Sequence, residues 1–436
     1  MKTRKKQEIE KTFPKTFLWG TATSATQIDG GDTASDWFEF CQKATAIKDK
    51  SSCFTACNHW NLFEKDFSLM KSYNLNAYRL GVDWSRFQPE NGSFNNAAMD
   101  HFRGMLNSLR KKKIRPLLTL NHFAHPIWWT KKGGWTREEN IEDFIKFIDF
   151  IVENTGDLVS EYITFNEPNV YWLLAYMGGI WPPANSGISG YINGMKVLRN
   201  MVIAHCRIYD RIKTIHSQKS FSNPVISIAQ HIRVMDPKNP GNLLDVDRAQ
   251  NADFRFNWMF PDAIQEGCLI KPLGNGEKIH DGQAWDFCGL NYYSRNMIEF
   301  DLFSPQSLFI KETTKTDSLK NDLGWEIYPE GLTRTILSAH KRYGLPIRIT
   351  ENGIAAVNDS QRQQYLVDHL GAVHTAMQQG AQVDGYYHWS FMDNFEWAEG
   401  YTAKFGLIEV DFETMARKPR ESAKLYKKII KSRRLP

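Results

Sequence analysis

Two glutamates in the sequence stand where they could act together as acid and base. Glu167 lies between Asn166 and Pro168. Because proline disfavours helical backbone in the residue before it, we expect Glu167 in extended backbone. Glu351 stands in the segment ITENG, directly before a turn-forming Asn-Gly pair. Two carboxyl groups can cleave a glycosidic bond when one protonates the leaving oxygen and the other attacks the sugar or activates water. The two glutamates therefore make this acid–base chemistry the first hypothesis.

Other polar side chains at the ends of apolar runs could tune the two carboxyl groups. Arg79 lies within the second such run, and Asn291 and Tyr293 close the sixth. An arginine and a tyrosine near one carboxylate would keep it ionised, as a nucleophile requires. The other carboxyl, with less compensation, would have a raised pKa and could serve as the acid.

The aromatic residues indicate a carbohydrate ligand. The chain has 14 Trp, 16 Tyr and 27 Phe, more than a core needs, and the apolar faces of sugar rings stack on aromatic side chains. Several tryptophans fall in expected loops: Trp128, Trp129, Trp135, Trp172, Trp181, Trp325 and Trp397. Any one of them alone is more often a packing residue than a ligand contact. Beside Gln27, His122, Asn166 and Glu396, however, the group predicts a sugar subsite.

The elements that must position these residues alternate between apolar runs and helix-period segments. Runs typical of buried strands cover residues 17–25, 75–84, 114–123, 162–168, 225–234, 286–293, 346–353 and 383–394. Between and after them, residues 140–156 and 421–432 carry apolar side chains at the spacing of one helix face. Strand counting alone leaves a doubly wound sheet as an alternative. Eight β/α units favour one closed barrel.

We therefore predict an α/β fold, a single (β/α)8 TIM barrel over residues 1–436. The longer gaps after the first, fourth and sixth strands are expected to form elaborated loops. The carboxyl ends of the parallel strands in such a barrel share one mouth. Polar residues from strand ends, including Trp389 near the end of the eighth run, should therefore converge there although they lie far apart in the sequence.

Charge is concentrated at the two ends of the chain. Residues 1–15 carry +4 and residues 417–436 carry +8 of a total of +5, so the rest of the chain has a net charge of −7. A nucleic-acid partner is not expected, because such proteins place positive charge across a binding face. We expect solvated basic tails at about 1–11 and 431–436. The beginning of the sequence is polar and no run is long enough for a membrane helix, so neither a secretory signal nor a membrane partner is expected.

The six cysteines predict free thiols in a reducing compartment. Six in 436 residues is far below the density of a disulfide scaffold, and we expect a cytoplasmic protein. Cys53 and Cys57 form a lone C-x3-C without a second ligand pair. His122 with His125, and the group Asp393, Glu396 and Glu399, also lack a recognised metal pattern. No metal and no cofactor are predicted.

Several segments carry a family resemblance over nearly the whole chain. The chain resembles glycoside hydrolase family 1, the β-glucosidase and β-galactosidase group. The segments that carry the resemblance are FLWGTATSATQIDG (17–30), YRLGVDWSRFQPENGSFN (78–95), TFNEP (164–168), ITENG (349–353) and YYHWSFMDNFEWAEGYTAKFGLIEVDF (386–412). Their order along the chain makes the resemblance far more specific than any one motif.

The resemblance implies a retaining enzyme and a role for each matched residue. Glu167 would be the general acid/base and Glu351 the nucleophile, with their carboxyl groups about 5–5.5 Å apart. Arg79 and Tyr293 would hold the nucleophile, with Asn291 nearby. The glycone would be held by Gln27, His122, Asn166, Trp389, Glu396 and Trp397, and Trp325 would flank the leaving group. The implied substrates are β-D-glucosides, with β-galactosides or β-fucosides, of short oligosaccharides or of aryl and alkyl aglycones.

Three alternatives stay open beside this hypothesis, and several positions depart from the family, among them Phe123, Ala124, Lys404 and the short loop after ITENGIA. A 6-phospho-β-glucosidase is disfavoured because Glu396 would repel a phosphate dianion. A transglycosylase would use the same two glutamates, and a non-catalytic sugar-binding protein is the least favoured because both are present. Asn169 stands after NEP, where family members often have Trp. A homo-oligomer is possible.

Overall fold

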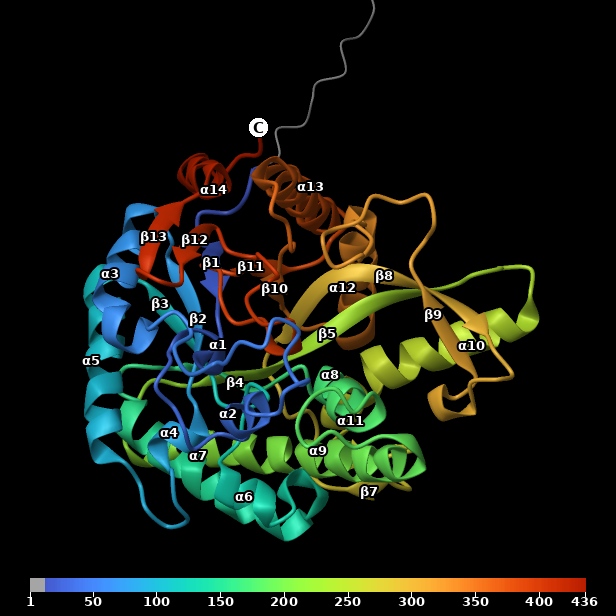
Figure 1. Ribbon diagram of the computed structural model, residues 1–436, viewed down its shortest axis with the longest axis horizontal. Helices are drawn as coiled ribbons and strands as arrows, with labels where there is room; N and C mark the ends of the chain where they lie inside the picture. Colours follow the sequence, from blue (N-terminus) through green and yellow to red (C-terminus); the bar gives the residue numbers. More distant parts are fainter. Residues whose placement is uncertain (1–11) are drawn as a thin grey trace, which may run out of the picture.

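Eight parallel strands form the centre of the computed structural model, which describes residues 12–436 (Figure 1). The strands are β1 (Leu18–Ala22), β2 (Ala77–Gly81), β3 (Arg115–Thr119), β4 (Glu161–Asn166), β5 (Val225–Pro237), β8 (Cys288–Phe300), β10 (Ile347–Asn352) and β11 (Val383–Trp389). Each pairs with the next in chain order, and β11 pairs with β1, so the sheet closes. The predicted TIM barrel is confirmed.

The strands of the barrel are covered on both faces by the rest of the protein, so their side chains on both faces are mostly apolar. Every residue of β2, β4 and β10 is buried, which is why these strands consist of near-continuous apolar runs. Each of the eight predicted runs overlaps one barrel strand, although β4, β5 and β8 extend beyond the predicted bounds.

Helices cover the outside of the barrel. The longer ones are α3 (His59–Ser72), α5 (Asn96–Lys112), α7 (Ile141–Thr155), α9 (Gly187–Gln218), α12 (Pro329–Tyr343), α13 (Asp359–Gln378) and α14 (Glu421–Ser432). α7 and α14 lie in the two segments where the sequence predicted helices, and each buries the apolar face that the spacing indicated. Within residues 12–436, no helix is both long and apolar enough to cross a bilayer.

Long connections build the mouth of the barrel, as expected after the first, fourth and sixth strands. They hold α1 (Ala25–Ile28) and α2 (Asp36–Cys41), then α8 (Pro168–Tyr171) and the π-helix η3 (Trp172–Met177), and then η5 (Pro305–Ser307) and β9 (Ile310–Thr313). The second and third connections hold short helical segments. They are α4 (Trp84–Phe87), α6 (Ile127–Lys131) and the 3-10 turns η1 (Gly134–Thr136) and η2 (Glu138–Asn140).

The fifth connection is also long, and the expectation of elaborated loops omitted it although the predicted runs leave residues 235–285 between them. It contains α10 (Leu243–Asp253), the π-helix η4 (Phe254–Trp258), α11 (Met259–Glu266), β6 (Cys268–Leu269) and β7 (Glu277–Lys278). Next to this connection, β5 and β8 stay paired beyond the barrel rim. Together with β9 and α10 they form an arm (Figure 1). The last connection adds the 3-10 turn η6 (Trp397–Glu399) and a hairpin of β12 (Ile408–Asp411) and β13 (Ala416–Pro419).

The basic C-terminal segment is only partly a solvated face. The buried side chain of Arg417 forms an ion pair with Asp66, and the nearly buried side chain of Arg420 forms one with Asp393. These two arginines contribute to the positive charge of residues 417–436, but their side chains are mostly shielded from solvent. At the very end, the backbone N–H of Phe13 donates to the carbonyl of Arg433 (2.9 Å). The predicted tail at 1–11 lies outside the described residues, and the division into one catalytic domain with basic tails stays a prediction.

Candidate active site

One cavity at the carboxyl ends of the strands gathers most of the predicted site residues. Its volume is about 300 Å³. Nine predicted residues line it: His122, Asn166, Glu167, Tyr293, Trp325, Glu351, Trp389, Glu396 and Trp397. The three others, Gln27, Arg79 and Asn291, are completely buried and contact lining residues through hydrogen bonds. The barrel therefore brings all twelve predicted residues to one place.

Glu351 is held by both of its predicted partners. Arg79 donates from Nη1 to Oε1 (2.5 Å), and the Tyr293 hydroxyl donates to Oε2 (2.6 Å). The pairing of β10 with β8 shifts register between Ile349 and Glu351. Such a bulge re-aims a side chain at a strand end, and here it brings the Glu351 carboxyl to the cavity.

Glu167 begins α8 in a conformation that differs from the expected one. Its φ of 44° and ψ of 58° place it in the left-handed region rather than in extended backbone. This conformation also avoids the right-handed helical region that Pro168 disfavours. A non-glycine residue in the left-handed region carries a conformational strain of roughly 1–3 kcal/mol. The carbonyl oxygen of Glu167 accepts hydrogen bonds from the N–H groups of Val170 and Tyr171, which hold it in this conformation. The strained backbone turns the carboxyl into the cavity.

A chain of amide hydrogen bonds links the two glutamates behind the cavity. Asn166 Oδ1 accepts from Arg79 (2.6 Å) and from Asn291 (3.0 Å), and the same Asn291 amide nitrogen donates to Glu167 Oε1 (2.8 Å). The Thr350 hydroxyl donates to Asn291 Oδ1 (2.7 Å), which fixes the orientation of that amide. Because these partners are buried and mutually satisfied, the distance between the two carboxyl groups is set by the barrel rather than by loops.

Burial and the charges that face the two carboxyls shift both of their pKa values. Burial, followed by the facing charge of Glu167, raises the pKa of Glu351 to about 7, although Arg79 and Tyr293 lower it. Burial also acts to raise the pKa of Glu167, but His231, Asn291 and Arg79 together hold it below its usual value. The two carboxyls therefore titrate as a coupled pair, and the assignment of Glu167 as the acid and Glu351 as the nucleophile stays a prediction.

A histidine that the sequence analysis did not select is the main partner of Glu167. His231 Nδ1 lies 3.0 Å from Glu167 Oε1. Burial, and then the charge of Arg233, lower the pKa of His231, while Glu167 acts in the opposite direction. The imidazole is therefore neutral near pH 7, where it acts on Glu167 through its N–H, and when the ring is protonated its charge also lowers the pKa of Glu167.

The side of the cavity that faces the first and eighth strands is polar and backed by aromatic rings. Gln27 donates from Nε2 to Asn394 Oδ1 (2.9 Å) and to Glu396 Oε2 (3.3 Å). Burial and the charge of Glu351 raise the pKa of Glu396 to about 8. His122 accepts from Asn166 at Nε2 (2.9 Å), so its Nδ1 carries the hydrogen, and this buried atom has no partner within residues 12–436.

The other side of the cavity is lined by exposed side chains. Trp325 is 37% exposed and meets the Tyr293 ring edge-on, with centroids 5.9 Å apart. Ile180 is 51% exposed. Arg233 also lines this side and lies 3.7 Å from Glu312.

The alternative metal ligands have other partners. His125 bonds to Asp36 and accepts from Trp135, so it is turned away from His122. Asp393 pairs with Arg420, and Glu399 pairs with Lys48. No group of three or more His, Cys, Asp or Glu in the described chain is placed to hold a metal ion.

Similarity to known proteins identifies the family of this chain. The model of glycosyl hydrolase family 1 matches residues 9–435. The chain belongs to glycosyl hydrolase family 1. It is 31% identical to a β-galactosidase of Pyrococcus woesei, over 96% of this chain and 97% of the relative. It is 32% identical to β-glucosidase A of Acetivibrio thermocellus, over 97% and 98%.

A solved structure of a β-glycosidase has the same fold over nearly its whole length. The β-glycosidase from Pyrococcus horikoshii superposes with a TM-score of 0.90 at 36% identity, covering 98% of this chain and 97% of that chain. The protein is a glycosyl hydrolase, a β-glycosidase of the β-glucosidase and β-galactosidase group.

Within this family 1 chain, His231 was missed although its signal was present. It stands in the fifth apolar run, and the rule that polar residues close barrel strands would have selected it. Arg233 was missed for a different reason, since it lies on the part of β5 that continues past the rim. Asn169, which departs from the family, donates from Nδ2 to the carbonyl oxygens of His231 (2.8 Å) and Phe256 (2.9 Å).

Proposed function

We propose that the protein is a retaining β-glycosidase that hydrolyses β-D-glucosides by double displacement. The observation that carries the proposal is the asymmetric protein environment of two carboxyls on one cavity. Both oxygens of Glu351 accept from fixed donors, Arg79 and Tyr293. Glu167 accepts on Oε1 only, and no donor in the described chain contacts its Oε2. The first is suited to attack, and the second is suited to exchange a proton with a ligand.

In the first step, Glu351 attacks the anomeric carbon and Glu167 protonates the leaving oxygen. One carboxylate oxygen of Glu351 forms the new bond, the glycosidic C–O bond breaks, and the proton on Glu167 moves to the aglycone oxygen. The pair must hold one proton for this step, with Glu351 ionised and Glu167 protonated. Coupled carboxyls titrate as a unit, and burial lets this pair keep that proton up to about pH 7.

In the second step, water takes the place of the aglycone. Glu167, now ionised, accepts a proton from the water while its oxygen attacks the anomeric carbon, and the ester bond to Glu351 breaks. Two inversions leave the β-configuration unchanged. Arg79 and Tyr293 then stabilise the released Glu351 carboxylate.

The polar side of the cavity is proposed to bind the glycone. His122 presents a buried Nδ1–H without a protein partner, which is free to donate to a sugar hydroxyl. Gln27 and Glu396 form a second polar pair, which can donate to and accept from neighbouring hydroxyls. Asn166 completes the set, and Trp389 and Trp397 supply apolar faces for the sugar ring. β-Galactosides and β-fucosides are proposed as further substrates.

The leaving group is proposed to lie on the exposed side, next to Trp325. A half-exposed tryptophan can stack on an aryl aglycone or on a second sugar ring without closing the cavity. Short oligosaccharides and aryl or alkyl glycosides fit such an open side.

A phosphorylated glycone is disfavoured by the charge around the cavity. Four glutamates line it, Glu167, Glu351, Glu396 and Glu399, against one arginine, Arg233. Arg233 already pairs with Glu312. A phosphate dianion would have no free guanidinium and would face several carboxyls.

Turnover on a matched pair of substrates tests the proposal. An aryl β-glucoside and its 6-phosphate are compared, and proton NMR identifies the anomer that the first product carries. We expect cleavage of the unphosphorylated sugar with the β-anomer appearing first. A preference for the phosphate would overturn the substrate class, an α-anomer would overturn the double displacement, and a persistent excess of glycosyl transfer over hydrolysis would make the protein a transglycosylase.

A cytoplasmic location is proposed on chemical grounds. All six cysteines, each within the described residues, are free thiols, and free thiols persist in reducing compartments.

A further inference from the structure

His231 is placed to control which oxygen of Glu167 carries a proton, and the following argument rests on the proposed acid/base role of Glu167. The Nδ1 of His231 and the Nδ2 of Asn291 both contact the same oxygen, Oε1, at 3.0 and 2.8 Å. Within residues 12–436, no hydrogen-bond donor reaches Oε2. A carboxyl whose one oxygen accepts two N–H groups carries its proton on the other oxygen.

The tautomer of His231 is fixed by its second nitrogen. Arg233 donates from Nε to His231 Nε2 (3.3 Å). An arginine side chain has donors only, so Nε2 must keep its lone pair. The hydrogen of the neutral ring is then on Nδ1, which makes His231 a donor to Glu167 and never an acceptor from it.

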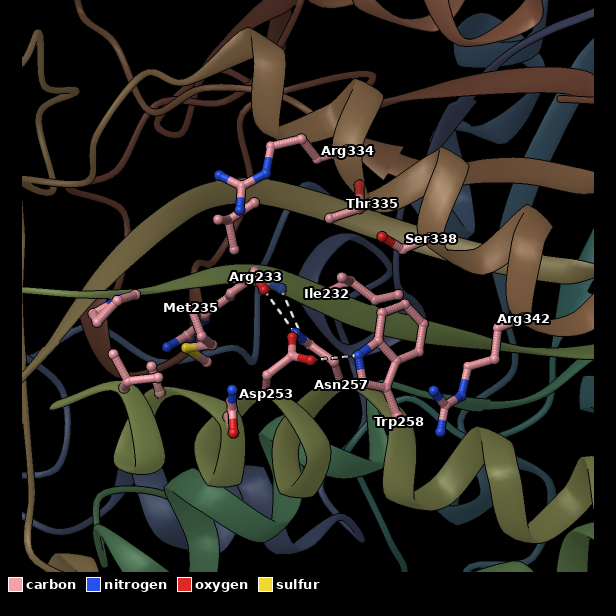
Figure 2. A pocket seen from close by; sticks show the side chains of 15 residues that line it. Ile232, Arg233, Met235, Asp253, Asn257, Trp258, Arg334, Thr335, Ser338 and Arg342 are labelled. Carbon is pink, nitrogen blue, oxygen red and sulfur yellow. Dashed lines mark hydrogen bonds between the residues drawn. The ribbon is translucent and has the colours of Figure 1, made fainter. Parts of the chain in front are cut away.

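Arg233 is itself fixed at a break in the sheet. The pairing of β5 with β8 shifts register between Ile232 and Val234. At this break, the side chain of Asn257 replaces the strand partner, since the Arg233 N–H donates to Asn257 Oδ1 (3.0 Å) and Asn257 Nδ2 donates to the Arg233 carbonyl (2.7 Å). Figure 2 shows both bonds at the edge of an outer cavity between β5, η4 and α12.

The arginine side chain and the histidine backbone are held as well. The Arg233 guanidinium lies over the Phe256 ring at 4.8 Å and pairs with Glu312 at 3.7 Å. The His231 carbonyl accepts from Asn169 Nδ2. The ring of His231 is thus fixed through its backbone and through its Nε2.

We propose that His231 is a positioning residue for Glu167. Its Nδ1–H, together with the Asn291 amide, occupies Oε1 and leaves Oε2 as the oxygen that gives the proton to the leaving group and takes it from water. Arg233 keeps His231 in this tautomer. His231 also stabilises the ionised form of Glu167, the form that acts as base in the second step.

The second step isolates this effect, because Glu351 is then an uncharged ester. A 2-deoxy-2-fluoro-β-glucoside with an activated leaving group serves as the probe, since the fluorine slows release of the glycosyl-enzyme. The reactivation rate is measured against pH. It falls as the pH drops through the pKa of Glu167, because the base must be ionised. The other ionisable groups that face Glu167 are Arg79, Tyr293 and Glu396, and no variant changes them.

Two substitutions separate the hydrogen bond from mere packing. His231→Asn places an amide N–H where Nδ1 stands, whereas His231→Leu places no donor there. Losing one hydrogen bond to a charged carboxylate should raise the pKa of Glu167, so His231→Leu should move the acid limb up by about one pH unit. His231→Asn should leave the limb where the native enzyme has it. Ile232→Val, whose side chain faces the outer cavity (Figure 2), is the control and should also leave it unchanged.

The outcomes distinguish this inference from the proposed function. If no covalent label forms, the double displacement is wrong. If label forms and reactivates but His231→Leu leaves the limb in place, or if Leu and Asn move it equally, the positioning role is wrong and the proposed function stands. Labelling the histidines with ¹⁵N gives an independent readout, with His231 assigned by its absence in His231→Asn. Its Nε2 should resonate as an unprotonated nitrogen, and a protonated Nε2 would overturn the tautomer.

Discussion

The cavity has a floor and a rim that are built in different ways. The floor consists of Arg79, Asn166, Glu167, Asn291 and Glu351, which come from strand ends, are buried and bond to one another. The rim consists of Ile180, Arg233, Trp325 and Glu399, which come from loops and from the arm. Trp325 and Ile180 are 37% and 51% exposed.

The difference teaches which part of the reaction each region controls. Floor groups hold each other within hydrogen-bond distance, so a change of one of them leaves buried partners unsatisfied. Rim groups face solvent, and the loss of one is compensated by water. The chemistry should therefore depend on the floor, and tolerance for different leaving groups should depend on the rim.

The largest effect is expected at the floor, from Glu351→Ala. Turnover should fall on the order of 10⁵-fold, because the nucleophile is lost and Arg79 and Tyr293 lose their acceptor. Added azide or formate should restore turnover and give a product of inverted configuration, as read by NMR. The control is Glu409→Ala, at an exposed carboxylate on β12, which should keep native activity. Activity without rescue in Glu351→Ala would mean that another group is the nucleophile.

The next effect separates the two floor carboxyls. Glu167→Gln removes the acid but keeps an acceptor for His231 and Asn291. Rates for poor leaving groups should fall about 10²- to 10⁴-fold, whereas rates for activated aryl groups, which leave without a proton, should fall far less in the first step. The measurement is a pre-steady-state burst for aryl glycosides of graded leaving-group pKa. Equal losses across the series would contradict the acid role.

A pH profile tests the shared proton of the floor. Burial and the charge of Glu167 raise the pKa of Glu351 to about 7, so the singly protonated pair persists up to that pH and empties above it. kcat/KM should therefore decline about tenfold per unit above about pH 7. On the acid side, the pKa of Glu167 is held below its usual value, so kcat/KM should stay high until the pH falls below the ordinary range of a glutamate. A decline that begins near pH 7 on the acid side would contradict a shared proton.

The smallest effect is expected at the rim. Trp325→Ala should raise KM for aryl glycosides by a few fold and leave kcat for a disaccharide nearly unchanged, because the side chain is 37% exposed and bonds to no floor group. The free energy of unfolding should change by less than about 1 kcal/mol, as measured by urea denaturation. A loss of kcat as large as that of a floor variant would erase the distinction between floor and rim.

The sequence alone determined the barrel and the residues of the floor. Apolar runs such as 114–123 and 162–168 indicate parallel strands that are buried on both faces, and their number, eight, favoured the barrel over a doubly wound sheet. The strand-end rule then placed Asn166, Glu167 and Glu351 at one mouth. Local backbone chemistry was less predictable. Pro168 excluded a right-handed helix at Glu167, but steric rules allow both extended and left-handed backbone there, and only contacts with the rest of the fold select between them.

Only the tertiary structure decided the electrostatics and the rim. The pKa shifts of Glu167 and Glu351 depend on how completely both are buried and on His231, which the chain brings next to Glu167 from 64 positions away. The arm of β5 and β8 forms because these two strands stay paired beyond the rim. No hydrophobic period in the sequence indicates this pairing. Hydrophobic periodicity reports which face of an element is buried, whereas desolvation and charge pairing depend on distances between segments, and those distances exist only after folding.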